Sequence, residues 1–190
     1  MAIDRRQLIL QAATKSFSMF GYKATTMDQI AKLANVGKGT IYTFYNNKEE
    51  LFDEIITHLI QEMKAAAEES MEESLTFYEN VNRALYRILE YRKEHQLTIK
   101  LFQEEKEIGT PAVKEFMKKL ESSIILYIQN IIQKAIDKEE IKPCNPEITA
   151  FVMLKMYIAL IFDWEKEHEA LEKEEIFKLF DQYFLKGLSI

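Results

Sequence analysis

An all-α fold of about nine helices is predicted for this chain by three features of its sequence. Apolar residues recur at intervals of three and four along most of the 190 residues, which is the spacing of one helix face. Only five glycines and three prolines interrupt this pattern. Hydrophobic residues make up 47% of the chain, which is enough for a packed core, so we do not expect disorder.

The first predicted helix covers residues 4–20 and shows the spacing of a buried face. Gly21 follows it and can adopt the left-handed conformation that ends many helices. Four apolar residues are expected on its inner face: Ile9, Ala13, Phe17 and Phe20.

Two further short helices are predicted next, joined by a tight turn at residues 35–37. The first begins at Thr26, and Gln29 three residues later completes a capping box. Its apolar residues keep the helical spacing: Met27, Ile30, Ala31 and Ala34. The second covers residues 38–45. Two of its residues are expected to face inward: Ile41 and Tyr45.

Longer helices are predicted for the rest of the chain. The fourth begins after Asn47, whose side chain is expected to cap it, with Glu50 completing a second capping box. Pro111 is placed to open the seventh helix, because proline is favoured at the first helical position. The other predicted helices cover residues 77–94, 96–107, 146–168 and 173–187.

The last two predicted helices are apolar on almost every face. A helix of that kind needs cover on every face, and one layer of neighbours in a domain of this size does not supply it. We therefore expect these two helices, including Phe180, to meet their copies across a two-fold axis in a homodimer. Burial of both helices inside a monomer is the alternative.

The net charge of −6 is unevenly distributed along the chain. Residues 1–50 hold seven Lys/Arg and four Asp/Glu, a charge of +3, whereas residues 51–190 carry −9. Such asymmetry indicates an anionic partner for the N-terminal part. The second helix of the helix-turn-helix pattern displays small, hydroxyl, aromatic and basic side chains, as is typical of a helix that enters a groove of double-stranded DNA.

Four segments of the N-terminal part carry a family resemblance. They are residues 21–26 (GYKATT), 30–31 (IA), 37–42 (GKGTIY) and 47–51 (NKEEL). In this order and without gaps, they resemble the N-terminal signature of the TetR family of bacterial transcription regulators. The resemblance covers about residues 5–55.

The resemblance implies an organisation in two domains. Residues 1–47 would form a three-helix helix-turn-helix DNA-binding head, and residues 48–190 a helical ligand-binding and dimerisation domain. It also implies a dimer in which a small molecule, bound in the C-terminal domain, changes the spacing of the two heads. Most members of the family are repressors that their ligand releases from DNA.

Eight residues of the head and of the start of the fourth helix are expected to face DNA, and Phe44 is one of them. Lys38 can donate to guanine O6 and N7, Gly39 lets the backbone approach the duplex, and Thr26 caps a helix whose N-terminal amides attract a phosphate. Residues assigned to phosphates are Thr26, Tyr42 and Lys48, of which the last two are carried over from the family. Residues assigned to base edges are Lys38, Thr40 and Thr43.

Two positions depart from the family pattern. Phe44 stands where the family often has histidine and cannot donate to a phosphate, so its contact becomes apolar packing in the head or against DNA. Asn46 stands where a basic residue is common, and the missing charge should make DNA binding less dependent on salt.

The expected effector is a small hydrophobic or aromatic molecule, because the C-terminal region is rich in methionine, aromatic and aliphatic residues. Packing in the core is the alternative role for each such residue. The candidate pocket residues are Tyr86, Leu89, Phe102, Phe116, Tyr127, Phe151, Met153, Met156 and Tyr157.

We expect no catalytic residue, metal site or cofactor, and no enzyme activity. The histidines His58, His95 and His168 lie far apart without a cysteine partner, and no Walker, GxSxG or GxGxxG motif is present. Cys144 is the only cysteine, which fits a reducing cytoplasm. The longest apolar stretch, residues 148–164, is short of the roughly 20 residues of a membrane span, so no membrane association is expected.

The sequence therefore predicts a cytoplasmic, dimeric transcriptional repressor that a small ligand releases from a palindromic operator. A transcriptional activator or a ligand-independent DNA-organising protein is the first alternative. An enzyme or lipid carrier that retains a vestigial head is the second.

Overall fold

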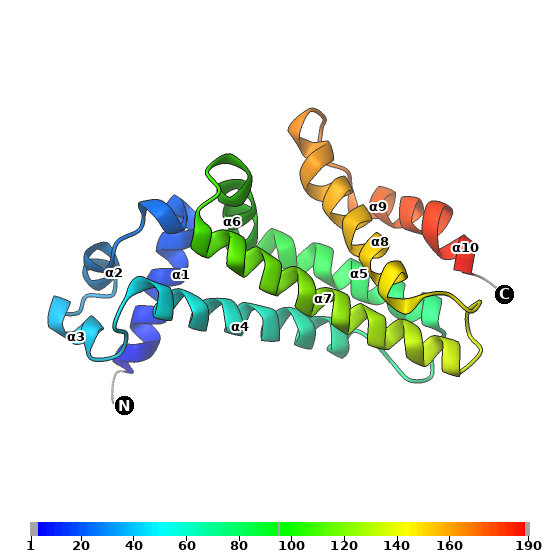
Figure 1. Cartoon of the computed structure of the whole chain (residues 1–190), viewed down its shortest axis with the longest axis horizontal. Helices are drawn as coiled ribbons and strands as arrows, with labels where there is room; N and C mark the ends of the chain where they lie inside the picture. Colours follow the sequence, from blue (N-terminus) through cyan, green and yellow to red (C-terminus); the bar gives the residue numbers. More distant parts are fainter. Residues whose placement is uncertain (1–3, 95, 189–190) are drawn as a thin grey trace. The chain divides into compact units, whose positions relative to one another are not determined.

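The computed structural model describes residues 4–94 and 96–188, and every regular element in this part of the chain is a helix (Figure 1). This confirms the predicted all-α fold. The chain divides into two compact units. Unit 1 comprises Met1–Met63 and Tyr91–Leu120, and unit 2 comprises Lys64–Glu90 and Glu121–Ile190.

Unit 1 is built from α1, α2, α3 and α6 with the first parts of α4 and α7. Their bounds are α1 (Arg5–Ala24), α2 (Met27–Leu33), α3 (Lys38–Tyr42), α4 (Lys48–Glu69), α6 (Gln96–Glu107) and α7 (Pro111–Asp137). The bounds of α6 and the start of α7 at Pro111 are as predicted. Helix α6 packs along α1, and α2 packs against both α1 and α3.

Helix α1 has the positive φ that was predicted at Gly21, but this angle produces a kink rather than the predicted end of the helix. Gly21, at φ 81° and ψ 171°, interrupts the helical backbone, and the helix then continues to Ala24. The prediction that Phe20 faces inward is wrong, since its side chain is 55% exposed. The kink turns Tyr22 inward instead, where its ring stacks on Phe17 at a centroid distance of 5.7 Å.

The core of unit 1 joins α1 to α4 and α7 through aromatic rings. Phe52 lies 5.3 Å from Phe17, 4.5 Å from Tyr22 and 5.7 Å from Phe116, measured between ring centroids. The aliphatic residues fully buried around them are Ile9, Ile30, Ile41, Leu51, Ile56 and Leu101. Burial of Ile9, Ala13 and Phe17 confirms three of the four predicted inner positions of the first helix.

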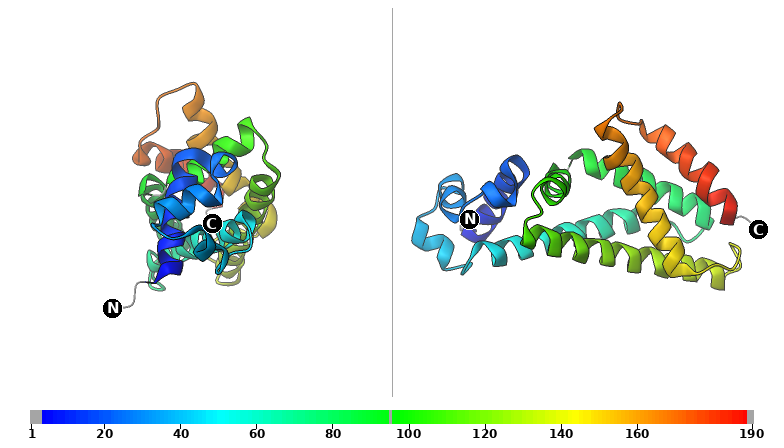
Figure 2. Two further views of the ribbon diagram at one scale, coloured as in Figure 1. Left: turned by 90° about the vertical axis from the view of Figure 1, so that its left-hand side faces the viewer. Right: turned by 45° about the horizontal axis from the view of Figure 1, so that its top comes forward.

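Unit 2 contains most of α5 (Phe77–Glu94), the later parts of α4 and α7, and the C-terminal helices (Figure 2). One apolar cluster gathers Phe77, Ile132, Met153 and Leu185 with their neighbours. A second cluster is formed by Leu89, Ile161, Ile176 and Phe180. Both clusters pack α5 against the two C-terminal helical segments.

The two C-terminal helices are less regular than predicted. Helix α8 (Pro146–Ile158) is followed by a π-helical turn, η1 (Ala159–Asp163), and a 3₁₀ turn, η2 (Trp164–Lys166). Helix α9 (Lys173–Phe180) runs through a second π-helical turn, η3 (Asp181–Leu185), into α10 (Lys186–Leu188). Each π turn widens the helix by one residue and shifts the faces that follow it, which hydrophobic spacing alone does not reveal.

Helix α8 is apolar on two faces, as the sequence predicted. Ala150, Met153 and Leu154 are buried inside unit 2. Its outer face carries three exposed apolar side chains: Ile148 (61%), Phe151 (45%) and Val152 (43%). Phe180, by contrast, is only 3% exposed, so its predicted place in an intermolecular interface is wrong. No helix in the described ranges is long and apolar enough to cross a membrane.

Candidate nucleic-acid interface

The helix-turn-helix is held together by caps and small buried residues. The Oγ1 atom of Thr26 accepts from the Gln29 amide at 3.3 Å, and the Gln29 Oε1 atom accepts from the Thr26 amide at 2.8 Å, which confirms the predicted capping box. Asn35 takes the left-handed conformation at the turn, with φ 53°. Four apolar residues pack this motif from inside: Ile30, Ala31, Ala34 and Ile41.

Helix α3 turns a continuous set of side chains away from the core. Ile41 is fully buried and Tyr45 is 2% exposed, both as predicted. Tyr42 is 44% exposed and Phe44 is 39% exposed. The remaining predicted DNA contacts of this helix are exposed or half-buried: Lys38, Gly39, Thr40 and Thr43. Most of the surface of α3 is thus exposed and available for contact with a DNA duplex.

Two polar side chains of this surface already have partners within the protein. The Lys38 ammonium forms an ion pair with Asp28 at 2.9 Å, and this pair raises the pKa of Lys38. The hydroxyl of Thr43 donates to the Thr40 carbonyl oxygen at 2.7 Å. Because that proton is in use, Thr43 is best suited to accept a hydrogen bond from a base amino group.

Lys48 is tied to the end of α1. Its ammonium donates to the carbonyl oxygens of Tyr22 at 2.8 Å and Thr25 at 2.9 Å, and it lies 4.1 Å above the centre of the Tyr22 ring. Partial burial lowers the pKa of Lys48. A lysine has three donors, so the third N–H is the one that its predicted phosphate contact would use.

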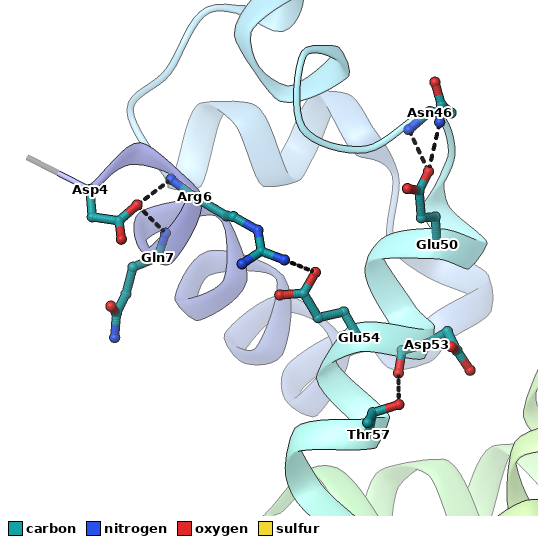
Figure 3. A network of polar contacts seen from close by, with 8 residues as sticks. All are labelled: Asp4, Arg6, Gln7, Asn46, Glu50, Asp53, Glu54 and Thr57. Carbon is teal, nitrogen blue, oxygen red and sulfur yellow. Dashed lines mark hydrogen bonds and ion pairs between the residues drawn. The ribbon is translucent and has the colours of Figure 1, made fainter.

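Ion pairs and caps fix the position of α4 in unit 1 (Figure 3). Arg6 of α1 pairs with Glu54 of α4 at 2.8 Å. Asn47 accepts from the Glu50 amide at 2.8 Å, as predicted for the cap of this helix. The predicted capping box is not completed at Asn47, because the Glu50 carboxylate accepts from the Asn46 amide at 2.9 Å and its side chain at 3.0 Å. Asn46, at the departure from the family pattern, is thereby fixed to α4.

A hydrogen bond between Tyr22 and Glu49 joins α1 to α4, and its strength depends on pH. The Tyr22 hydroxyl donates to Glu49 at 2.8 Å. This hydrogen bond lowers the pKa of Glu49, whereas burial, followed by Glu49, raises the pKa of Tyr22. A lowered carboxylate pKa contributes stability that is present above the ordinary value of 4.5 and is lost as pH falls through the folded value.

Tyr22→Phe is therefore expected to lower the free energy of unfolding at pH 7 by about 0.5–1 kcal/mol, a small value because Glu49 is exposed. The difference from wild type should shrink as the pH is lowered below 4.5. Urea unfolding between pH 7 and pH 3 at one protein concentration would measure it, with Tyr42→Phe as the exposed control. A difference independent of pH would contradict the assignment.

The predicted effector residues are divided between the two units. Phe102 and Phe116 belong to the core of unit 1. Leu89, Met156 and Tyr157 lie in one cluster of unit 2 and Met153 in the other. Phe151 is exposed, and Tyr86 donates to Glu174 at 3.1 Å. Their role in binding a common ligand stays a prediction.

Three buried polar atoms of unit 2 have no hydrogen-bond partner among the described residues. They are the hydroxyl oxygens of Tyr78 and Tyr127 and the side-chain oxygen of Asn82. Burial raises the pKa of Tyr127 to about 12. Buried polar atoms are nearly always paired, so each of these atoms is a candidate partner for the polar end of a ligand. Sequence reasoning selected Tyr127 but missed Tyr78 and Asn82, whose i, i+4 spacing was the available signal.

Unit 2 also has an open cleft of about 510 Å³ at the connection between α4 and α5. Its floor is apolar and includes Phe77, Ile131 and Ala135, and its rim carries glutamates and lysines. None of the nine predicted effector residues lines this cleft.

No group of three or more metal-binding side chains occurs within residues 4–94 and 96–188. His58 and His168 are exposed, and the His168 ring stacks on Trp164 at 3.8 Å. His95 lies outside the described residues.

Residues 9–55 match the family model of bacterial regulatory proteins of the tetR family. The uncharacterized HTH-type transcriptional regulator YhgD of Bacillus subtilis (strain 168) is 67% identical over 189 residues, which cover 100% of this chain and 99% of that protein. The sequence similarity to this relative extends over the whole chain, including the C-terminal helices.

Solved structures with the same fold are more distant in sequence. The fatty acid degradation regulator FadR from Bacillus halodurans has a TM-score of 0.80 at 16% identity, covering 99% of this chain and 98% of that one. SmeT, in a complex with triclosan, has a TM-score of 0.79 at 16% identity, covering 98% and 92%. At these identities, the likeness shows the fold alone.

Proposed function

Because this chain belongs to the tetR family of bacterial regulatory proteins and is a DNA-binding transcriptional regulator, we propose that it is a dimeric repressor of a palindromic operator. A small hydrophobic ligand would release it from DNA. The observation that carries the proposal is the outward-facing surface of α3 and its C-cap Thr43, on which Lys38, Tyr42 and Thr43 are exposed around a buried Ile41. A cytoplasmic location follows from the DNA partner.

The dimer is proposed to form through the outer face of α8 with help from the C-terminal helical segment. Ile148, Phe151 and Val152 lie at the i, i+3, i+4 spacing of a single helix face. Tyr183, in η3, is 69% exposed. Exposed apolar side chains gathered on one face mark an interaction surface, and a two-fold axis lets one such face cover its own copy. Two recognition helices could then occupy successive major grooves.

The effector is proposed to bind in unit 2 near Tyr78, Asn82 and Tyr127. Mostly apolar walls with a few polar groups are typical of small-molecule sites, and these three atoms would give a ligand its polar contacts. The triclosan complex of SmeT supports a small-molecule ligand for a protein of this fold. Ligand binding would lower DNA affinity by the difference between its binding free energies to the two conformations.

The proposal is tested by selecting duplexes from a random-sequence DNA library with the full-length protein. We expect an inverted repeat with half-sites one helical turn apart, roughly 34–36 Å. On the selected duplex, Tyr42→Ala should weaken binding to all sequences. Lys38→Ala should relax preference at one base pair and cost about 1–3 kcal/mol there. Fluorescence anisotropy with the selected and a scrambled duplex measures both effects.

Lys32 lies in α2 outside the proposed DNA contacts, so Lys32→Ala is the matched control for the loss of one positive charge. Selection of no sequence at all would contradict a sequence-specific regulator and favour a DNA-organising protein. A uniform loss on Lys38→Ala would remove direct base readout by this residue. Tighter DNA binding in the presence of a ligand would favour the alternative of an activator or co-repressed regulator.

A further inference from the structure

Glu104 is a buried carboxylate that joins α6 to the end of α1. Its side chain is 5% exposed, although it lies in a stretch of charged residues. One carboxylate oxygen accepts from the Tyr22 amide at 2.6 Å, and the other accepts from the Lys23 amide at 3.0 Å. The sequence separation of these contacts exceeds 80 residues.

The kink at Gly21 makes this contact possible. The left-handed φ of 81° frees the amides of Tyr22 and Lys23 from the helical hydrogen-bond ladder and turns them toward α6. A Cβ atom at position 21 would clash with the Glu104 carboxylate. The glycine is therefore required both for the backbone angle and for the close approach of the carboxylate.

Glu104 is also tied to the beginning of α7. The Thr110 hydroxyl donates to the second carboxylate oxygen at 2.7 Å. The Glu104 carbonyl oxygen accepts from the amides of Ile108 and Gly109, both at 3.0 Å, which closes the end of α6. Glu104 thus connects three elements: the end of α1, the end of α6 and the first residues of α7.

The segment that Glu104 holds leads directly into the helix-turn-helix. Thr25 is fully buried, and its hydroxyl group lies 2.8 Å from the Gly21 carbonyl oxygen and 3.1 Å from the Ser16 hydroxyl. The next residue, Thr26, caps α2. A shift of the Tyr22 and Lys23 amides therefore moves the start of α2, and α3 packs on α2.

A buried carboxylate is tolerated only while its hydrogen bonds are made. Displacement of α6 from α1 would leave the Glu104 charge without two of its three donors. We propose, building on the DNA-binding function above, that Glu104 is a positioning residue that couples α6 to the recognition helix. Any change that moves α6 then alters operator affinity through residues 22–26.

The test compares full-length wild type with Glu104→Gln and Glu104→Leu, using the duplex selected by the wild type and a scrambled duplex. Glutamine keeps the length of the side chain and one acceptor, whereas leucine keeps neither acceptor. We expect the ratio of specific to non-specific affinity to fall roughly tenfold for glutamine and further for leucine, since a hydrogen bond to a charged group is lost. The salt dependence should not change, because no phosphate contact is removed.

Amide hydrogen exchange at Tyr22 and Lys23 is the second measurement. Exchange there should rise about tenfold in Glu104→Gln, in the same rank order as the loss of specific affinity. Glu107→Gln, an exposed glutamate of the same helix, controls for the lost charge and should match wild type. If both Glu104 variants fail to fold, Thr110→Val replaces them. This substitution leaves the Glu104 carboxylate in place with one hydrogen-bond donor fewer. It should lower the specificity ratio and raise amide exchange at Tyr22 and Lys23, both by less than the Glu104 substitutions.

Two results would overturn the coupling. One is unchanged exchange at both amides. The other is an unchanged specificity ratio in a folded variant, which includes equal losses of affinity for the selected and scrambled duplexes, as a purely structural role would give. If the wild type selects no sequence, the proposed function fails and the coupling fails with it. If it does select a sequence and Glu104→Leu keeps the specificity ratio, only the coupling fails.

Discussion

Phe151→Glu is expected to convert the proposed dimer to a monomer and to abolish specific binding to a two-fold symmetric operator. Phe151 is 45% exposed on the outer face of α8, between Ile148 and Val152. An uncompensated buried charge costs about 3–5 kcal/mol, and a two-fold interface buries two copies of it. The dimer dissociation constant should therefore rise on the order of 10⁴-fold or more. Sedimentation equilibrium measures it.

Matched substitutions separate dissociation from unfolding. Ile108→Glu changes an apolar residue of unit 1 that is 51% exposed and lies outside the proposed interface, so the dimer should persist. Tyr183→Glu should weaken the dimer as Phe151→Glu does. Phe180→Glu should instead unfold unit 2, because that ring is buried among Leu89, Ile161 and Ile176. A fully dimeric Phe151→Glu variant with wild-type circular dichroism would refute the α8 interface.

Gly21→Ala is expected to destabilise the protein by about 3–5 kcal/mol. A φ of 81° with ψ near 171° is open almost only to glycine and costs another residue about 1–3 kcal/mol. The new methyl group would also displace the Glu104 carboxylate from the Tyr22 amide. For a chain of this size, each kcal/mol lowers Tm by roughly 2–4 °C. Calorimetry at a fixed protein concentration should show a fall of about 10 °C.

Gly39→Ala provides the opposite case. Gly39 is helical, and an added Cβ atom would meet nothing within 4 Å. Alanine favours the helix by roughly 0.5–1 kcal/mol, so Tm should stay equal or rise slightly. Affinity for the selected duplex should fall, because the methyl group stands where the backbone is proposed to approach DNA. Equal losses of Tm for the two glycine variants would contradict this distinction.

Helix positions and the helix-turn-helix could be predicted because their signals are local. Thr26 with Gln29, the turn at Asn35 and the proline at position 111 each specify a boundary through neighbouring residues. The π turns after Ile158 and Phe180 could not be predicted, since the spacing of apolar residues carries no signal for one extra residue in a helical turn.

The long-range contacts of Glu104 and Lys48 could not be predicted from the sequence for a different reason. Glu104 stands beside Glu105 and close to Glu107, and a run of charges on a helix is normally exposed to solvent. Its burial depends on an unusual backbone angle at Gly21, more than 80 residues away. Likewise, Lys48 matched a DNA-contacting position of the family, but its two bonds to carbonyl oxygens depend on the end of α1.

The proposed contact of Lys38 with DNA requires its ion pair with Asp28 to open first. Both side chains are largely exposed, at 65% and 53%, so solvent and salt weaken the pair and it can open readily. In the proposed complex, a guanine edge or a phosphate within hydrogen-bond distance would replace Asp28 as the partner of the ammonium. Under the proposed function, Asp28 would therefore compete with weakly bound anions for the Lys38 ammonium, and it orients that side chain in the unbound protein.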